Sequence, residues 1–76
     1  MGNDSYKRLR DLIVDARKTT GLTQADLARR LKRPQSFVSK YERGERRLDI
    51  VEFGEVANAL GIDVVHFLRR FYSGEA

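Results

Sequence analysis

The chain has 76 residues with 41% hydrophobic content, which suffices for one domain with one small core and leaves no room for a deep catalytic cleft. It has no cysteine, so neither a disulfide nor a thiolate zinc site can stabilise it, and its net charge is +4. No stretch is long and apolar enough for a membrane span, and the first six residues lack a secretory signal, so we expect a cytoplasmic protein with no membrane partner.

The charged residues are unevenly distributed along the chain. Residues 29–47 hold eight basic side chains against two acidic ones, whereas residues 48–76 hold two basic and five acidic ones. A local excess of basic side chains predicts a surface that meets phosphates, while the acidic remainder is repelled by them. The distribution therefore points to a nucleic acid as partner.

Capping residues and a glycine delimit the first two predicted helices. The first begins near Asp4 or Ser5, either of which can cap it, and Gly21 ends it. Thr23 caps a second, shorter helix, with Asp26 three residues later in the place of the glutamate of a capping box. Both carry apolar residues at helical spacing: Leu9, Leu12, Ile13 and Ala16 in the first, and Ala25, Leu27, Ala28 and Leu31 in the second.

A third helix follows after a tight turn. Arg33 precedes a proline and is therefore pushed out of the helical region of backbone space. Pro34 suits the opening turn of a helix that runs to Tyr41 or Arg43, and Gly44 ends it.

Two further helices complete the chain. Asp49 caps the fourth, which Gly61 closes, and its inward-facing residues are expected to be Ile50, Phe53, Val56, Ala57 and Leu60. Asp63 starts the fifth, which bears Val64, Val65, Phe67, Leu68, Phe71 and Tyr72. The pattern predicts an all-α, compact five-helix fold in one domain over residues 1–76, with a helix-turn-helix at about 23–43 and a last helix at about 63–72.

The second and third helices have the properties of a helix-turn-helix. Their inner faces carry small or branched residues that can fix the crossing angle, namely Ala28, Leu31, Val38 and Tyr41. The outer face of the third helix carries Gln35, Ser36, Ser39, Lys40 and Arg43. A glutamine in this place can bond an adenine edge at two atoms.

At these residues the chain resembles the helix-turn-helix family of Cro and the phage repressors, the xenobiotic-response-element or XRE family. The most specific segments are Thr23-Gln24-Ala25-x-Leu27-Ala28, Gln35-Ser36-x-Val38-Ser39, Tyr41-Glu42-x-Gly44 and Ala57-x-Ala59-Leu60-Gly61. The resemblance covers nearly the whole chain and implies a lambda-repressor-like fold and sequence-specific binding of double-stranded DNA.

The resemblance also implies roles for individual residues. Base contacts would come from Gln35, Ser36, Ser39 and Lys40, and phosphate contacts from Gln24, Arg43, Arg46 and Arg47. Arg17 and Glu42 stand where family members often place an ion pair that joins the first and third helices. In one departure from the family pattern, Lys32 occupies the place of a turn glycine and is expected to adopt positive φ. In another, Gly54 interrupts the fourth helix.

The fifth helix carries more apolar surface than one small chain can cover. We expect a two-fold interface formed by Val64, Phe67, Phe71 and Tyr72. A homodimer would place two recognition helices about 34 Å apart, the spacing of two half-sites of a palindromic operator.

No residues gather into an enzyme site or a metal site in the sequence. His66 has no second histidine, cysteine or suitably spaced carboxylate, and no nucleophile, base and glycine-rich loop converge. We therefore predict no catalysis, no cofactor, no metal and no small-molecule ligand.

The prediction is a cytoplasmic, nucleoid-associated homodimeric regulator that represses by occluding its operator. One alternative remains open at this point, an antitoxin-type or other protein-interaction module with secondary DNA binding. Another is a fragment of a larger regulator.

Overall fold

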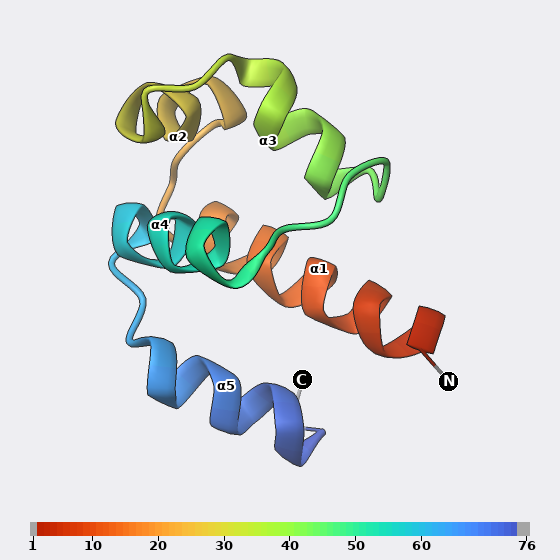
Figure 1. The fold of residues 1–76 in the computed structure, drawn as a ribbon. Coiled ribbons are helices and arrows are strands. Elements are labelled where there is room, and N and C mark those ends of the chain that lie inside the picture. Colours follow the sequence, from red (N-terminus) through yellow and green to blue (C-terminus); the bar gives the residue numbers. More distant parts are fainter. Residues whose placement is uncertain (1, 75–76) are drawn as a thin grey trace.

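The computed structural model describes residues 2–74, with side chains from residue 5 onward. This part forms five helices and no strand: α1 (Gly2–Thr19), α2 (Gln24–Leu31), α3 (Gln35–Glu42), α4 (Ile50–Leu60) and α5 (Val64–Ser73). Helices α1 and α4 lie in the middle, with α2 and α3 on one side of them and α5 on the other (Figure 1). The all-α five-helix prediction is confirmed.

The predicted capping residues act as expected at three helix starts. Thr23 and Asp26 form a reciprocal capping box at α2, with both hydrogen bonds at 3.0 Å. Asp49 and Glu52 form a second capping box at α4. At the start of α5, the Asp63 carboxylate accepts from the backbone N–H of His66. The predicted start of α1 near Asp4 or Ser5 was wrong. The helix begins at Gly2, so both residues lie inside it.

Lys32 ends α2 in the left-handed conformation, at φ 57° and ψ 42°. It is the one non-glycine residue with positive φ within residues 2–74. Its N–H donates to the carbonyl of Arg29, and the N–H of Arg33 donates to that of Ala28 at 3.0 Å, so these two carbonyls near the end of the helix are satisfied. The expected positive φ is confirmed, and the turn between α2 and α3 closes without a glycine.

The core gathers side chains from all five helices. Among the most deeply buried are Leu27 on α2, Val38 and Tyr41 on α3, and Val56 on α4. Burial without a hydrogen-bond partner for the hydroxyl raises the pKa of Tyr41. Ile50 was expected to face inward but is 74% exposed, because the first residue of α4 lies beyond the edge of the core.

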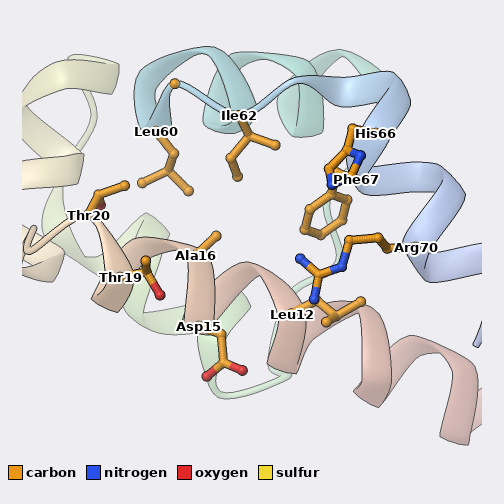
Figure 2. A pocket seen from close by; sticks show the side chains of 11 residues that line it. Leu12, Asp15, Ala16, Thr19, Thr20, Leu60, Ile62, His66, Phe67 and Arg70 are labelled. Atoms are coloured by element: carbon orange, nitrogen blue, oxygen red, sulfur yellow. The ribbon is translucent and has the colours of Figure 1, made fainter. Parts of the chain in front are cut away.

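A hollow of about 440 Å³ separates α1 from the start of α5. Leu12 and Phe67 lie against it, and Asp15, His66 and Arg70 stand around it (Figure 2). None of the residues that line the hollow belongs to α2 or α3. Within residues 2–74, none of the helices combines the length and the hydropathy that a membrane-spanning helix needs.

Candidate nucleic-acid interface

Helix α3 divides its residues between the core and the surface. Phe37, Val38 and Tyr41 are buried, since they recur on one side of the helix against the core. The four side chains predicted to contact bases share the opposite side: Gln35, Ser36 and Lys40 are exposed, and Ser39 is half-buried. The structure therefore presents all four on the outer surface of the helix-turn-helix.

A buried ion pair joins the end of α1 to the end of α3. Arg17 donates from Nε and Nη2 to the two carboxylate oxygens of Glu42, at 2.8 and 3.0 Å. Its Nη1 donates to the carbonyl of Leu22 at 2.7 Å. The two side chains are 10% and 6% exposed, and the hydrogen bonds to Glu42 raise the pKa of Arg17. The pair suggested by the resemblance is thus present, and it fixes the C-terminal end of α3.

Gln24 lies between this ion pair and the exposed face of α3. Its Nε2 donates to Oε1 of Glu42 at 2.8 Å, and its Oε1 accepts from Nε2 of Gln35 at 3.5 Å. The two glutamines start α2 and α3, so the helix-turn-helix brings both helix N-termini to one place. Neither contact of Gln24 could be found from spacing, because they join residues 18 and 11 positions apart.

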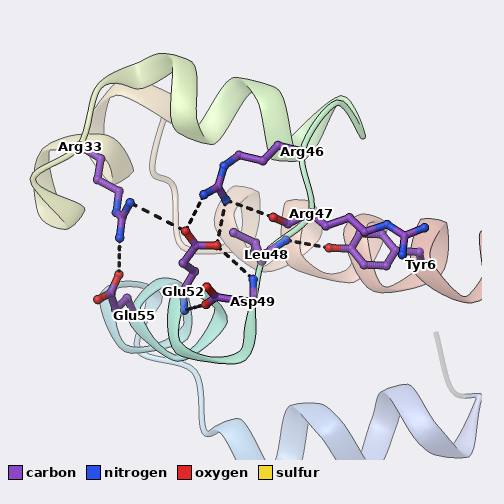
Figure 3. Close-up of polar contacts among 8 residues, drawn as sticks. All are labelled: Tyr6, Arg33, Arg46, Arg47, Leu48, Asp49, Glu52 and Glu55. Carbon is purple, nitrogen blue, oxygen red and sulfur yellow. Dashed lines mark hydrogen bonds and ion pairs between the residues drawn. The ribbon is translucent and has the colours of Figure 1, made fainter.

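The loop between α3 and α4 is held by a cluster of arginines and glutamates (Figure 3). Arg46 donates to both carboxylate oxygens of Glu52, at 2.9 and 2.6 Å. Arg33 donates to Glu55 at 3.0 Å. Both guanidinium groups stack on the ring of Phe37, 4.5 Å from its centroid for Arg33 and 4.7 Å for Arg46. The cluster ties the turn before α3 and the loop after it to α4.

Arg46 makes internal contacts that the sequence did not predict. The sequence placed it among the phosphate contacts, but its guanidinium fork is occupied by Glu52 and stacked on an aromatic ring. Hydrogen bonds from Arg46, and then from the backbone N–H of Asp49, lower the pKa of Glu52 to about 2. Arg46 therefore organises the loop. Helical spacing could not predict this contact, because Arg46 lies in the loop and Glu52 lies in α4.

The two other predicted arginines lie at the surface. Arg43 donates to both oxygens of Glu45, at 2.9 and 3.1 Å, and to the Ser39 hydroxyl at 2.6 Å. The guanidinium of Arg47 lies 4.6 Å from the ring centroid of Tyr6, whose hydroxyl accepts from the backbone N–H of Leu48 at 2.8 Å. Tyr6, which the sequence did not single out, thus holds the loop that carries Arg47 (Figure 3).

The residues predicted for a dimer interface do not share one environment. Val64 and Phe71 are half-buried and Tyr72 is 78% exposed. Phe67 is 5% exposed, and its ring lies 5.5 Å from that of Phe53 in the core. We therefore correct the assignment of Phe67: it faces its own chain, because the helical turn directs it between α1 and α4.

A different set of apolar side chains is exposed near α5. These are Ile50, Val51, Val65 and Tyr72. Ile50 and Tyr72 also line a groove of about 160 Å³ between α1, α4 and α5, together with Leu9, Leu48, Asp49, Phe53, Leu68 and Phe71. The exposed apolar surface thus includes the start of α4 as well as α5.

Comparison with known proteins identifies the family. The helix-turn-helix family model matches residues 13–67, and no curated protein matches the chain. The structure is similar to that of an XRE-family like protein from Pseudomonas syringae pv. tomato str. DC3000, at 44% identity and a TM-score of 0.93, covering 99% of this chain and 92% of that one.

A second group of similar structures belongs to the restriction-modification controller protein C.Esp1396I. The wild-type controller is 25% identical, with a TM-score of 0.83 and 91% of each chain covered. The same controller as a tetramer in complex with its natural 35 base-pair operator gives a TM-score of 0.81 at 25% identity, again with 91% of each chain covered. On these matches and the geometry above, the chain belongs to the XRE family of helix-turn-helix DNA-binding transcription regulators.

Proposed function

We propose that the chain is a homodimeric transcriptional repressor that binds a palindromic operator with α3 in the major groove. The observation that carries this proposal is the separation of polar and apolar residues on α3. The apolar residues of the helix are buried in the core, and its outer face carries Gln35, Ser36, Ser39 and Lys40. An α-helix fits the major groove, and polar side chains on its outer face can reach base edges there.

Phosphate contacts surround this face. We assign them to Gln24 at the start of α2, and to Arg43 and Arg47 at and beyond the end of α3. A helix N-terminus favours an anion, and exposed arginines neutralise the charge of the DNA backbone. Arg46 is paired with a glutamate as Arg43 is, but it is less exposed and is stacked on Phe37, so we assign it to support of the loop and not to DNA. The operator complex of the controller protein supports this mode of binding for a chain of the same fold.

In this proposal, a second copy of the chain binds to the exposed apolar surface of α4 and α5. Four large hydrophobic residues are exposed to solvent in the single chain, namely Ile50, Val51, Val65 and Tyr72. The last helix, α5, also carries the half-buried Val64 and Phe71. Covering them with their own copies removes apolar area from water and pairs two recognition helices symmetrically. Such a dimer covers its operator and represses by occlusion, and it acts in the cytoplasm, associated with the nucleoid.

Selection from a pool of random duplexes tests the DNA half of this proposal. The protein should enrich two identical, inverted half-sites whose centres lie about one helical turn, or a small multiple of it, apart. Enrichment of a single half-site would contradict the palindrome, and no enrichment would contradict sequence-specific binding.

Sedimentation equilibrium tests the dimer half. The wild-type protein alone should be a dimer, and Tyr72→Asp should shift it toward monomer because a charge in an apolar interface is costly to desolvate. Asn58→Asp, which adds the same charge on the exposed surface near the other end of α4, should leave the dimer intact. A monomer that associates only with another protein would favour the interaction module instead.

A further inference from the structure

Four polar side chains form a row from the buried end of α1 to the exposed start of α3. Arg17 donates to Glu42, Nε2 of Gln24 donates to Oε1 of Glu42 at 2.8 Å, and Nε2 of Gln35 donates to Oε1 of Gln24 at 3.5 Å. The inner end of the row is the least exposed, with Arg17 at 10% and Glu42 at 6%. The outer end is the amide assigned above to a base edge.

The hydrogen bonds of the row converge on Glu42, which accepts from Arg17 on one side and from Gln24 on the other. An ionised carboxylate only accepts hydrogen bonds, so Glu42 selects the NH2 group of Gln24 and turns the Gln24 oxygen away from itself. That oxygen faces Gln35 and selects its NH2 group in turn. The last N···O separation is long for a hydrogen bond, but an oxygen in place of that nitrogen would be repelled, so the preference for one amide orientation persists.

We propose that Glu42 is a positioning residue that fixes the orientation of the Gln35 amide through Gln24, and that this makes the protein prefer adenine to guanine at one operator position. The inference rests on the proposed placement of α3 in the major groove. With one N–H of Gln35 directed at Gln24, its Oε1 and its other N–H remain for the DNA.

The two purines respond differently to an amide held in this way. Adenine presents an N7 acceptor and an N6 donor, which match one N–H and the oxygen of the amide. Guanine presents two acceptors, N7 and O6, so the fixed oxygen of Gln35 would face another oxygen. An amide that is free to turn can offer its NH2 group to guanine and so loses this discrimination.

The decisive variant is Glu42→Gln, which keeps the size of the side chain but can present either end of an amide to Gln24. Duplexes that differ only by adenine or guanine at the position relaxed by Gln35→Ala provide the measurement. The dissociation constant for the guanine duplex divided by that for the adenine duplex should fall about tenfold in Glu42→Gln. The matched control is Glu52→Gln, which also removes a carboxylate paired with an arginine by two hydrogen bonds, and which should keep the wild-type ratio.

A second variant distinguishes loss of the positioning contact from loss of folding. Gln24→Met leaves the Arg17–Glu42 pair in place but removes the amide between Glu42 and Gln35. It should lower the same ratio to the same extent, although it also weakens binding to every sequence because Gln24 is assigned to a phosphate. In the free protein, Glu42→Gln should shift the side-chain amide NMR signals of Gln35, which it does not contact directly.

The outcomes separate this inference from the proposed function. A wild-type ratio in Glu42→Gln, a wild-type ratio in Gln24→Met, or unchanged Gln35 amide signals overturns the positioning role while leaving DNA binding intact. A Gln35→Ala variant that relaxes no position also overturns it. Absence of any sequence preference in the unmodified protein overturns the proposed function itself.

Discussion

At the scale of single residues, two glutamates with similar surroundings have different tasks. Glu42 joins α1 to α3 beneath the exposed face of α3, whereas Glu52 joins the loop after α3 to α4. Each accepts two hydrogen bonds from one arginine, a geometry that is stronger and more specific than a single-point contact. The first is a candidate for control of specificity and the second for stability of the loop.

Removal of Arg17 is expected to be strongly destabilising. Arg17→Ala leaves the Glu42 carboxylate buried without its charged partner, and breaking a buried pair in this way costs about 3–5 kcal/mol of unfolding free energy. Denaturant unfolding measures the loss. An unchanged free energy of unfolding together with unchanged DNA affinity would show that the pair has neither a structural nor a functional role.

Glu52 makes stability depend on pH in the acid range. Its pKa is about 2 in the folded chain against an ordinary value of 4.5, so the folded state favours the ionised form. Its contribution is fully present above pH 4.5 and is lost as the pH falls toward 2, because the unfolded chain takes up the proton first. Urea midpoints between pH 7 and pH 2.5 should fall less steeply for Glu52→Gln than for wild type. Parallel curves would exclude this linkage.

At the scale of helices, local signals were sufficient for most boundaries. Thr23, Asp49 and Asp63 were recognised as caps because a cap depends on residues within one turn. The environments of Ile50 and Phe67 were predicted wrongly, since both are apolar residues at helical spacing and only the packing of other helices decides which one is covered. The same limit applies to Arg46, whose partner Glu52 lies on another element.

Gly54 in α4 provides a test of helix propensity without interference from packing. A Cβ added there would have no neighbour within 4 Å, and φ is not in the left-handed region. Gly54→Ala should therefore stabilise the protein by roughly 1 kcal/mol. The control is Gly61→Ala, which should destabilise because φ is +72° at that position. Thermal unfolding of both variants measures the difference, and a destabilised Gly54→Ala would mean that the glycine has another role.

At the scale of the whole molecule, fold and family could be predicted from sequence, and so could the Arg17–Glu42 pair through the family resemblance, while most other long-range polar contacts could not. Motifs such as Gln35-Ser36-x-Val38-Ser39 indicated which face of α3 is exposed, because helical periodicity alone separates that face from the core. The Gln24 contacts and the support of the loop by Tyr6 depend on segments distant in sequence. They became visible only when the helices were placed relative to one another.

The arginines of the α3–α4 loop should separate in their dependence on salt. Arg47→Ala should reduce the slope of log affinity against log salt by about one, because one phosphate contact is lost. Arg46→Ala should lower stability and leave that slope close to wild type, because its guanidinium is held by Glu52. Binding titrations at several salt concentrations distinguish the two. A larger change of slope for Arg46→Ala than for Arg47→Ala would reverse the assignment.

The central claim is that the outer face of α3 reads bases, and Gln35→Ala tests it most directly. The measurement is the affinity of wild type and variant for the selected operator and for a random duplex of equal length, at one salt concentration. The variant should lose about 1–3 kcal/mol on the operator and much less on the random duplex. An equal loss on both duplexes, or none on either, would contradict base reading by this face.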